Sequence, residues 1–496
     1  MRFAPAALLA ASSGLIASAA FDPLDVPYLM VLSLVVLFAL FRQLADLRWW
    51  EVFGVGAAWG VAFFGPLIWW MRAVSEGAYV GLVIAEGVFL GVIALGLRLA
   101  AGLRAWPLAL PAVWVLGEQW RGAFPFTGFP WGRLVHTSLD TPLESWVRLI
   151  GMPATSFLMA CLATALLVVA DASARHRLLA ASAIVAAVLL GAVLPTGVAG
   201  QHDTARFAVI QGDVPGEFLS WPRGEIFKLH AAETQRLVDR IAGGDSPVPD
   251  VVLWPENSSD TDPTRTPSES ERLDELVADL GAPILVGGML PGPELGTVYN
   301  AGVVWTEDGP GESYVKRKPV PYGEYVPFRD VAGSFVPRVD RDIPRDMLPG
   351  DEPGGLTIGG VRIGDTICYD IAYDSVAADA IGDDAEVLVV QTSNAAFTGT
   401  AQPEQQWEIS RLRAVETGRW VLVPSTNGIS GAIDADGQVV ERAPMRRPAT
   451  IGVEVPLAEG RTPAARVGRP LGWLVVAAGL LAWCAGFARR HGEGME

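Results

Sequence analysis

The sequence contains eight apolar stretches, each close to the length that a helix needs to cross a lipid bilayer. The bilayer core is about 30 Å thick, so a spanning helix takes roughly 20 apolar residues. The stretches lie at about 4–20, 27–45, 51–71, 79–101, 105–120, 149–170, 178–197 and 470–488. Because backbone groups in lipid must pair internally, the pattern predicts a bundle of about eight transmembrane helices.

A long polar region separates the seventh stretch from the eighth, and its charge differs. Residues 1–200 carry 11 basic and 10 acidic residues, whereas the whole chain has a net charge of −17, so residues 201–496 carry −18. We expect three parts: a transmembrane bundle over 1–197, a large α/β domain over 198–468, and a last transmembrane helix with a tail over 469–496. The acidic balance argues against nucleic-acid binding, which needs basic surfaces.

Arginine placement predicts the orientation in the membrane. If all seven spans are retained, one set of alternate loops and both chain ends share a side, and that side carries Arg2, Arg42, Arg48, Arg98, Arg104, Arg175, Arg177, Arg489 and Arg490. Positive loops face the cytoplasm, so we expect a multi-pass protein of the bacterial plasma (inner) membrane with the α/β domain on the extracytoplasmic side. The first stretch ends in ASAAFD, which resembles a signal-peptide cleavage site, but six further spans favour a retained helix.

Two carboxylates fall in or near these spans. Glu86 lies inside one predicted helix, and Glu118 lies near the end of another. Ionisable groups in lipid are costly and often functional, but a hydrogen-bonded contact between helices would also explain them. Both interpretations stay open from the sequence.

From about residue 205, short β-rich runs alternate with amphipathic helical segments. The runs are RFAVIQG, DVVLWPE, PILVGGML, NAGVVWT, VRIGDTICYD, AEVLVVQTS, RWVLVPST and SGAIDADG. The helical patterns include GEIFKLHAAETQRLVDRIAGG and QPEQQWEISRLRAVETG. Apolar strands that alternate with helices predict layered sheets covered by helices.

One cysteine stands apart from the other two. Cys161 and Cys484 fall in predicted spans, while Cys368 is the single cysteine of the outer domain. It is either a small buried core residue or a nucleophile at a strand end. A nucleophilic thiol needs a base because its pKa is about 8.5. His202 and His230 stand in no strand-end motif, so a Cys–His pair has little support.

A carboxylate and a lysine are better candidate partners. Glu256 directly follows the apolar run VVLWP, where a strand end delivers side chains to the sheet edge, although it also begins a loop. A buried glutamate can accept and return the thiol proton. Lys316 follows another β-like run and can stabilise a negative carbonyl oxygen, with Arg317 and Lys318 as rivals. Three adjacent cations are also typical of a solvated surface.

The three segments LWPENS, KRKPVPYGEYVPF and ICYD, in that order, resemble the carbon–nitrogen hydrolase (nitrilase) superfamily. With seven spans before them and one after, they are most similar to its membrane-bound branch, the bacterial apolipoprotein N-acyltransferases. This resemblance implies a nitrilase-like αββα sandwich for the outer domain. It implies a catalytic triad of Glu256, Lys316 and Cys368, with Lys316 placed eight positions before Glu324 of PYGE.

The resemblance also assigns supporting residues. Glu324 matches a carboxylate that supports the site, Tyr369 matches the aromatic residue after the nucleophile, and Trp221 resembles a tryptophan near the substrate entrance. Asp370 stands where the family usually has glutamate, so its reach is one methylene shorter. In the loop SNAAFTGTAQPEQQW, residues 395–397 lack the acidic and tryptophan residues often seen there, which leaves acyl-chain preference open.

The implied activity is N-acyl transfer by a ping-pong mechanism. An acyl chain would move from a phospholipid through a Cys368 thioester to the α-amino group of the diacylglyceryl-cysteine of a lipoprotein. We expect no metal, no organic cofactor and a monomer. The alternatives are a membrane-tethered nitrilase-type amidase or hydrolase, in which water replaces the amine, and a binding protein that has kept the fold without catalysis.

Overall fold

The chain forms two compact units. The computed structural model describes residues 2–44, 46–171, 173–193, 201–214, 221–329, 343–382 and 384–492. One unit comprises Met1–Thr196 and Pro463–Glu496, and the other comprises Gly197–Thr462. The last helix thus belongs to the same unit as the first seven, although the whole second unit separates them in sequence.

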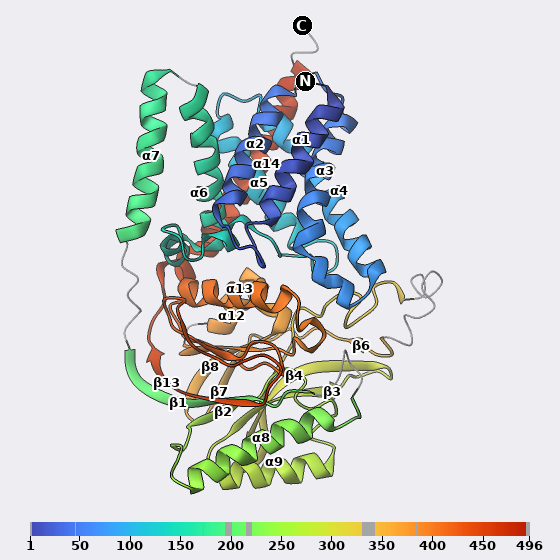
Figure 1. Cartoon of the computed structure of the whole chain (residues 1–496), viewed down its shortest axis with the longest axis vertical. Coiled ribbons are helices and arrows are strands. Elements are labelled where there is room, and N and C mark those ends of the chain that lie inside the picture. Colours follow the sequence, from blue (N-terminus) through green and yellow to red (C-terminus); the bar gives the residue numbers. More distant parts are fainter. Residues whose placement is uncertain are drawn as a thin grey trace. The chain divides into compact units, whose positions relative to one another are not determined.

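The first unit is helical, with eight α-helices in its described ranges (Figure 1). Their bounds are α1 Phe3–Ser18, α2 Tyr28–Gln43, α3 Trp49–Leu67, α4 Glu76–Ala100, α5 Trp106–Arg121, α6 Glu144–Asp171, α7 Ala174–Val193 and α14 Pro463–Gly492. Five of the described helices, α3, α4, α6, α7 and α14, are long and apolar enough to cross a membrane. Helices α1, α2 and α5 have only 16 residues each, so their crossing stays a prediction.

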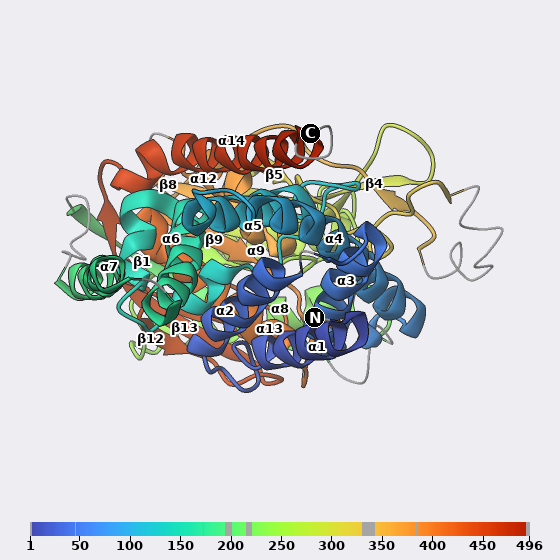
Figure 2. The same ribbon diagram turned by 90° about the horizontal axis from the view of Figure 1, so that it is seen from above.

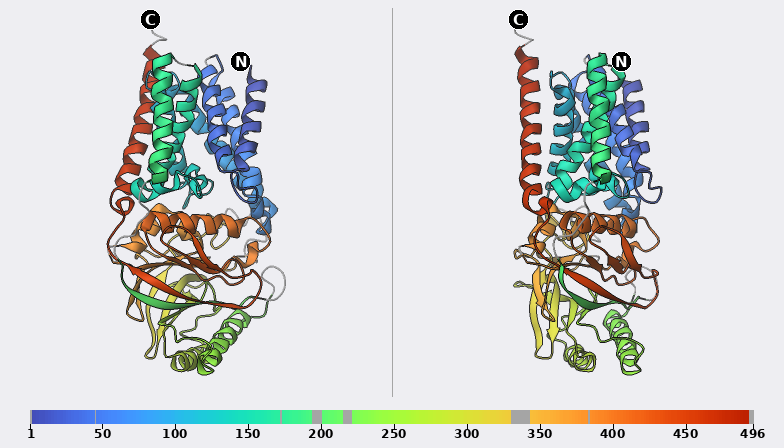
Figure 3. Two further views of the ribbon diagram at one scale, coloured as in Figure 1. Left: turned by 60° about the vertical axis from the view of Figure 1, so that its left-hand side comes forward. Right: turned by 90° about the vertical axis from the view of Figure 1, so that its left-hand side faces the viewer.

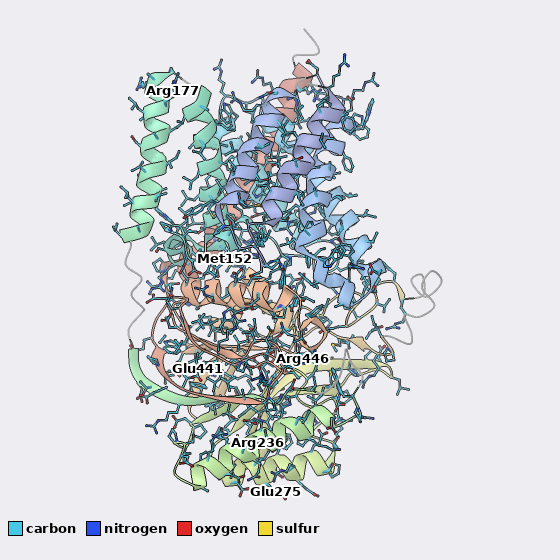
Figure 4. All side chains as sticks on the ribbon, viewed as in Figure 1. Met152, Arg177, Arg236, Glu275, Glu441 and Arg446 are labelled. Atoms are coloured by element: carbon cyan, nitrogen blue, oxygen red, sulfur yellow. The ribbon has the colours of Figure 1, made fainter. Side chains whose placement is uncertain are left out.

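Small residues allow these helices to pack closely. From above, α14 runs beside α5 and α6 (Figure 2). A Cβ at Gly479 of α14 would lie 2.3 Å from the carbonyl oxygen of Ala112 on α5, so only glycine permits this approach. Helix α6 is kinked at Gly151, whose φ of 74° and ψ of 172° break the helix beside Met152 (Figure 4).

The two carboxylates singled out in the spans both make contacts within the helical unit. Glu86 Oε2 lies 3.7 Å from Arg121 Nη1, and both side chains are buried. Glu118 Oε1 accepts hydrogen bonds from Trp114 Nε1 at 3.0 Å and from the Leu134 N–H at 2.7 Å. These contacts join α4, α5 and the segment after α5, so the structure favours the helix-contact interpretation.

The second unit is a four-layered αββα sandwich, in which two sheets stack between helices (Figure 3). The first sheet has the order β13-β1-β2-β3-β4-β5, with β6 beside β4, and the second has the order β12-β11-β10-β9-β8-β7. The first-sheet strands are β1 Gln201–Gln211, β2 Val251–Leu253, β3 Ile284–Pro291, β4 Thr297–Thr306, β5 Gly309–Val315, β6 Asp346–Met347 and β13 Ala449–Ala458. The second-sheet strands are β7 Gly355–Ile358, β8 Val361–Ile367, β9 Val387–Gln391, β10 Val421–Val423, β11 Gly431–Ile433 and β12 Val439–Arg442.

Helices α8 (Glu225–Ala242) and α9 (Pro267–Leu280) cover the first sheet, and α12 (Asp374–Ile381) and α13 (Gln402–Thr417) belong to the layer of the second (Figure 1). Figure 4 marks Arg236 on α8 and Glu275 on α9 in the outer helical layer. The predicted αββα fold is confirmed, and every β-rich run and helical pattern quoted from the sequence forms the expected element.

Alternating side chains build two cores. Phe207 and Val209 of β1 face the second sheet, whereas Ala208 and Ile210 face α8 and α9. This alternation is expected for a strand buried on both faces. Because both faces are covered, the strand ends become the places where polar side chains can gather.

Candidate active site at the strand ends

The predicted site residues follow strands that end at corresponding edges of the two sheets. Strand β2 is parallel to β3, and β3–β4 and β4–β5 are antiparallel, so β5 runs in the same direction as β2. Glu256 follows β2 and Lys316 follows β5, which places both at one edge of the first sheet. In the second sheet β8 and β9 are parallel, with Cys368 after β8 and Ser393 after β9.

Lys316 lies between two carboxylates. Its Nζ is 3.0 Å from Glu256 Oε1 and 2.6 Å from Glu324 Oε1, and its side chain is 1% exposed. Burial alone would lower the pKa of Lys316, but Glu256 and Glu324 outweigh it and raise that pKa well above its usual value. Burial also raises the pKa of Glu324, an effect that Lys316 opposes. The site therefore holds a permanent positive charge out of water.

Two residues that the sequence analysis missed fix the Glu256 carboxylate. Asn300 Nδ2 donates to Oε1 at 2.7 Å, and the Ser393 N–H donates to Oε2 at 3.0 Å. Asn300 opens the run NAGVVWT and meets Lys316 across the β4–β5 hairpin, where the Lys316 N–H donates to its carbonyl oxygen at 2.9 Å. The sequence shows a polar residue at the start of an apolar run. Only the pairing of β4 with β5 shows that this residue lies next to Lys316.

Cys368 is the first residue of the 3-10 turn η3 (Cys368–Ala372), directly after β8, and its φ is +52°. A non-glycine residue rarely adopts such a backbone conformation, and strain of this kind is common at functional sites. Burial, followed by the charge of Glu256, raises the pKa of the Cys368 thiol to about 12, while Lys316 and a hydrogen bond with Thr392 oppose the shift. The resting group is therefore a thiol that lies within the field of the same carboxylate and ammonium.

Asp370 joins the cysteine turn to the lysine segment. It is fully buried, and its Oδ2 accepts from the Tyr314 hydroxyl at 2.6 Å and from the Arg317 N–H at 3.3 Å. Its Oδ1 accepts from the Lys318 N–H at 2.9 Å. The shorter aspartate thus binds two successive backbone N–H groups of the loop that begins at Lys316.

The rival cations point to other partners. Arg317 Nη1 pairs with Asp379 Oδ2 at 2.9 Å, and Lys318 Nζ lies 5.3 Å from the centre of the Tyr373 ring. Of the three adjacent cations, the structure brings Lys316 to Glu256. His230, the rival base, is buried on α8, where its Nδ1 lies 2.8 Å from the Ile226 carbonyl oxygen, and burial lowers its pKa to about 4.

The structure also describes the remaining residues that the sequence analysis singled out. Tyr369 is buried and packs edge-on against Tyr373, with ring centres 5.2 Å apart. Trp221 is half-buried in a bend before α8, and residues 215–220 before it are outside the described ranges, so its place at an entrance stays a prediction. Ala395–Phe397 form a short 3-10 turn, η4, between β9 and α13. Within the described ranges, no three His, Cys, Asp or Glu side chains are grouped to hold a metal ion.

The chain matches two family models. Residues 13–165 match the apolipoprotein N-acyltransferase N-terminal domain, and residues 235–463 match the carbon–nitrogen hydrolase domain. Together with the apolar helices and the sandwich, these matches define a membrane-bound acyltransferase whose second unit is of the nitrilase type.

Relatives narrow this class to one family. An apolipoprotein N-acyltransferase of Mycolicibacterium smegmatis is 33% identical over 86% of this chain and 76% of its own length. Another, of Azotobacter vinelandii, is 30% identical over 99% of this chain and 96% of its own length. The chain belongs to the apolipoprotein N-acyltransferase family. Among solved structures, an amidase of the nitrilase superfamily from Nesterenkonia AN1 is similar over 52% of this chain and 94% of its own, with 17% identity and a TM-score of 0.39.

Proposed function

We propose that this protein moves an acyl chain from a membrane phospholipid to the α-amino group of the diacylglyceryl-cysteine at the N-terminus of a lipoprotein. The observation that carries the proposal is the buried group at the strand ends. Lys316 contacts Glu256 at 3.0 Å, and both act electrostatically on the Cys368 thiol. An acid–base group, a fixed cation and a thiol are the parts that acyl transfer through a thioester needs.

In the first half-reaction, Glu256 takes the proton of the Cys368 thiol as Sγ attacks the ester carbonyl carbon of the phospholipid. Lys316 and a backbone N–H near Tyr369 stabilise the oxyanion that forms. The C–O bond then breaks, Glu256 returns the proton to the leaving oxygen, and a lysophospholipid departs. The acyl chain remains on Cys368 as a thioester.

In the second half-reaction, the lipoprotein α-amine attacks the thioester carbon. Glu256 accepts a proton from the attacking nitrogen, the C–S bond breaks, and the thiol of Cys368 is restored with that proton. Lys316 keeps its charge throughout because its carboxylate partners raise its pKa well above the usual value. Glu324 holds Lys316 in place at 2.6 Å, and Asp370 holds the loop that follows.

Both substrates carry acyl chains, which fits a membrane protein. Arg177 near the start of α7 (Figure 4) and Arg489 and Arg490 at the end of α14 belong to the cytoplasmic positive set, so we place the second unit on the extracytoplasmic side of the inner membrane. The protein acts as a monomer in this proposal.

The test is an assay of the purified full chain in phospholipid–detergent micelles with a synthetic diacylated lipopeptide. We expect an N-acylated lipopeptide and one lysophospholipid for each product formed. Release of free fatty acid without N-acylation would instead identify a hydrolase, and the absence of any turnover would support a binding protein. A lipopeptide with a blocked α-amine is the matched control substrate.

A further inference from the structure

The second unit buries an acidic side chain that the proposed reaction does not use. Asp365 lies in the middle of β8, three residues before Cys368, and is fully buried between the sheets. Neither of its carboxyl oxygens has a side-chain hydrogen-bond partner in the described part of the chain. A buried ionised carboxylate without a partner is very costly, so its protonation state requires an explanation.

Asp365 faces the amide of Gln391, the last residue of β9. A Cβ added to Gly302 of β4 would lie 2.3 Å from Gln391 Oε1 and 2.4 Å from Asp365 Oδ2, so the two oxygens flank one point between the sheets. Gln391 Oε1 also has no hydrogen-bond partner among the described residues. Because Gly302 has no side chain, the Asp365 carboxyl and the Gln391 amide have room to approach each other.

The orientation of the Gln391 amide is set on its other side. Its Nε2 donates to the carbonyl oxygen of Trp254 at 2.7 Å. Exchanging the amide nitrogen and oxygen would place Oε1 against that carbonyl and leave two acceptors in contact. The oxygen of Gln391 therefore points towards Asp365, where it needs a donor.

We propose that Asp365 is a neutral carboxylic acid whose hydroxyl donates to Gln391 Oε1, and that this contact makes Asp365 a positioning residue for Glu256. Burial, reinforced by the charge of Asp370, raises the pKa of Asp365 well above its usual value, while the Thr366 N–H opposes the shift. A proton shared between the two facing oxygens would satisfy both at once.

The contact would act on Glu256 along two short backbone paths. Trp254, whose carbonyl oxygen Gln391 holds, comes two residues before Glu256. Ser393, whose N–H donates to Glu256 Oε2 at 3.0 Å, comes two residues after Gln391. Fixing the Gln391 side chain therefore fixes both segments that aim the carboxylate. The effect on activity rests on the proposed function, whereas the proton on Asp365 does not.

Infrared difference spectra of the full chain test the proton directly. At pH 7, we expect the wild type to show a carboxylic-acid C=O band that is missing from Asp365→Asn. The matched control is Thr366→Val, which removes a hydrogen bond to the Val389 carbonyl at the adjacent buried position and should keep the band. If Asp365→Asn removes a carboxylate band and no acid band, Asp365 is ionised and the proposal is overturned.

Kinetics test the positioning role. Asparagine keeps a donor towards Gln391, so Asp365→Asn should keep the rate of Cys368 acylation within about threefold, whereas Asp365→Leu should lower it about tenfold at unchanged KM for phospholipid. Equal rates in Asp365→Leu and the wild type would overturn the positioning role. If the wild type itself forms no acyl-enzyme, the proposed function fails, while the infrared result still decides the proton.

Discussion

The helical unit and the α/β unit both bury charge, but they do so over different distances along the chain. In the helical unit, Glu118 finds its partners in Trp114 and Leu134, close by in sequence, and Glu86 pairs with Arg121 on the next helix. In the α/β unit, the carboxylate that follows β2 meets a lysine that follows β5 and an N–H that follows β9.

Under the proposed function, this difference separates charges that hold the structure together from charges that take part in the reaction. A partner nearby in sequence needs only local packing, and such contacts hold helices together. Several strand ends must converge to place Lys316, Glu256 and Cys368 in one electrostatic group, and Cys368 has a φ of +52° there. Strained and convergent groups of this kind are typical of active sites.

Removing the nucleophile should have the largest effect. Cys368→Ala should abolish transfer to the lipopeptide, a loss on the order of 10³-fold or more, because no thioester can form. Cys161→Ala, in helix α6, is the matched control and should transfer normally. Lipopeptide acylation measured by mass spectrometry decides between them, and equal loss in both variants would place the chemistry outside the strand ends.

Neutralising the base should lower the transfer rate less than removing Cys368 does, but it should also change the pKa of the Cys368 thiol. Glu256→Gln should slow transfer by about 10²-fold, the lower end of what a general acid–base group contributes. Its charge helps to raise the pKa of Cys368 to about 12, so removing that charge favours the thiolate and should bring the pKa down. The pH dependence of alkylation by iodoacetamide measures this pKa. An unchanged or higher value would show that Glu256 does not act on the thiol.

Weakening the contact that Asp370 makes between the cysteine turn and the loop after Lys316 should lower activity and stability moderately. Asp370→Asn faces N–H and O–H donors with an amide group, so we expect about a tenfold slower acylation of Cys368 and about 1–3 kcal/mol lower stability. Asp379→Asn is the matched control, because the pair that Asp379 forms with Arg317 is partly exposed and lies outside the Asp370 contacts. Acylation rates and thermal unfolding should show a larger loss in Asp370→Asn than in Asp379→Asn. A larger loss in Asp379→Asn would refute the role of Asp370.

A change in the helical unit should alter stability and leave the chemistry alone. Glu86→Gln removes the charge beside Arg121 and should cost about 1–3 kcal/mol of stability, while acyl transfer stays within about twofold of the wild type. Thermal unfolding in detergent, followed by the lipopeptide assay well below the midpoint, checks both. If transfer fell as far as in Asp370→Asn, the charges of the two units would not differ in role.

The sequence predicts helices and strands better than it predicts which of them contact one another. The apolar lengths predict the helical unit, and the β-rich runs and their alternation predict the strands. Helix α9 has apolar residues at Leu273, Leu276, Val277 and Leu280. This is the spacing of an amphipathic helix, and it is visible in the sequence alone. The pairing of β1 with β13 has no local signal, because all the other strands of the second unit lie between these two in the sequence.

For the candidate site, Glu256, Lys316 and Cys368 each follow a β-like run, and their order along the chain carries the resemblance to the family. The role of Asn300 could not be predicted from the sequence, because it depends on the register of the β4–β5 hairpin. The closeness of Asp365 and Gln391 depends on the register of β8 against β9 and on the space that Gly302 leaves on the facing sheet, and no single segment encodes either. Long-range geometry is therefore what the structure adds.

The most direct test of the convergence at the strand ends is the mass of the peptide that contains Cys368. After incubation of the full chain with phospholipid alone, we predict a hydroxylamine-sensitive acyl adduct on Cys368 that disappears when the diacylated lipopeptide is added and reappears as its N-acyl amide. Lys316→Met should form almost no adduct. An adduct on another residue, or lipopeptide acylation that persists in Cys368→Ala, would contradict the account.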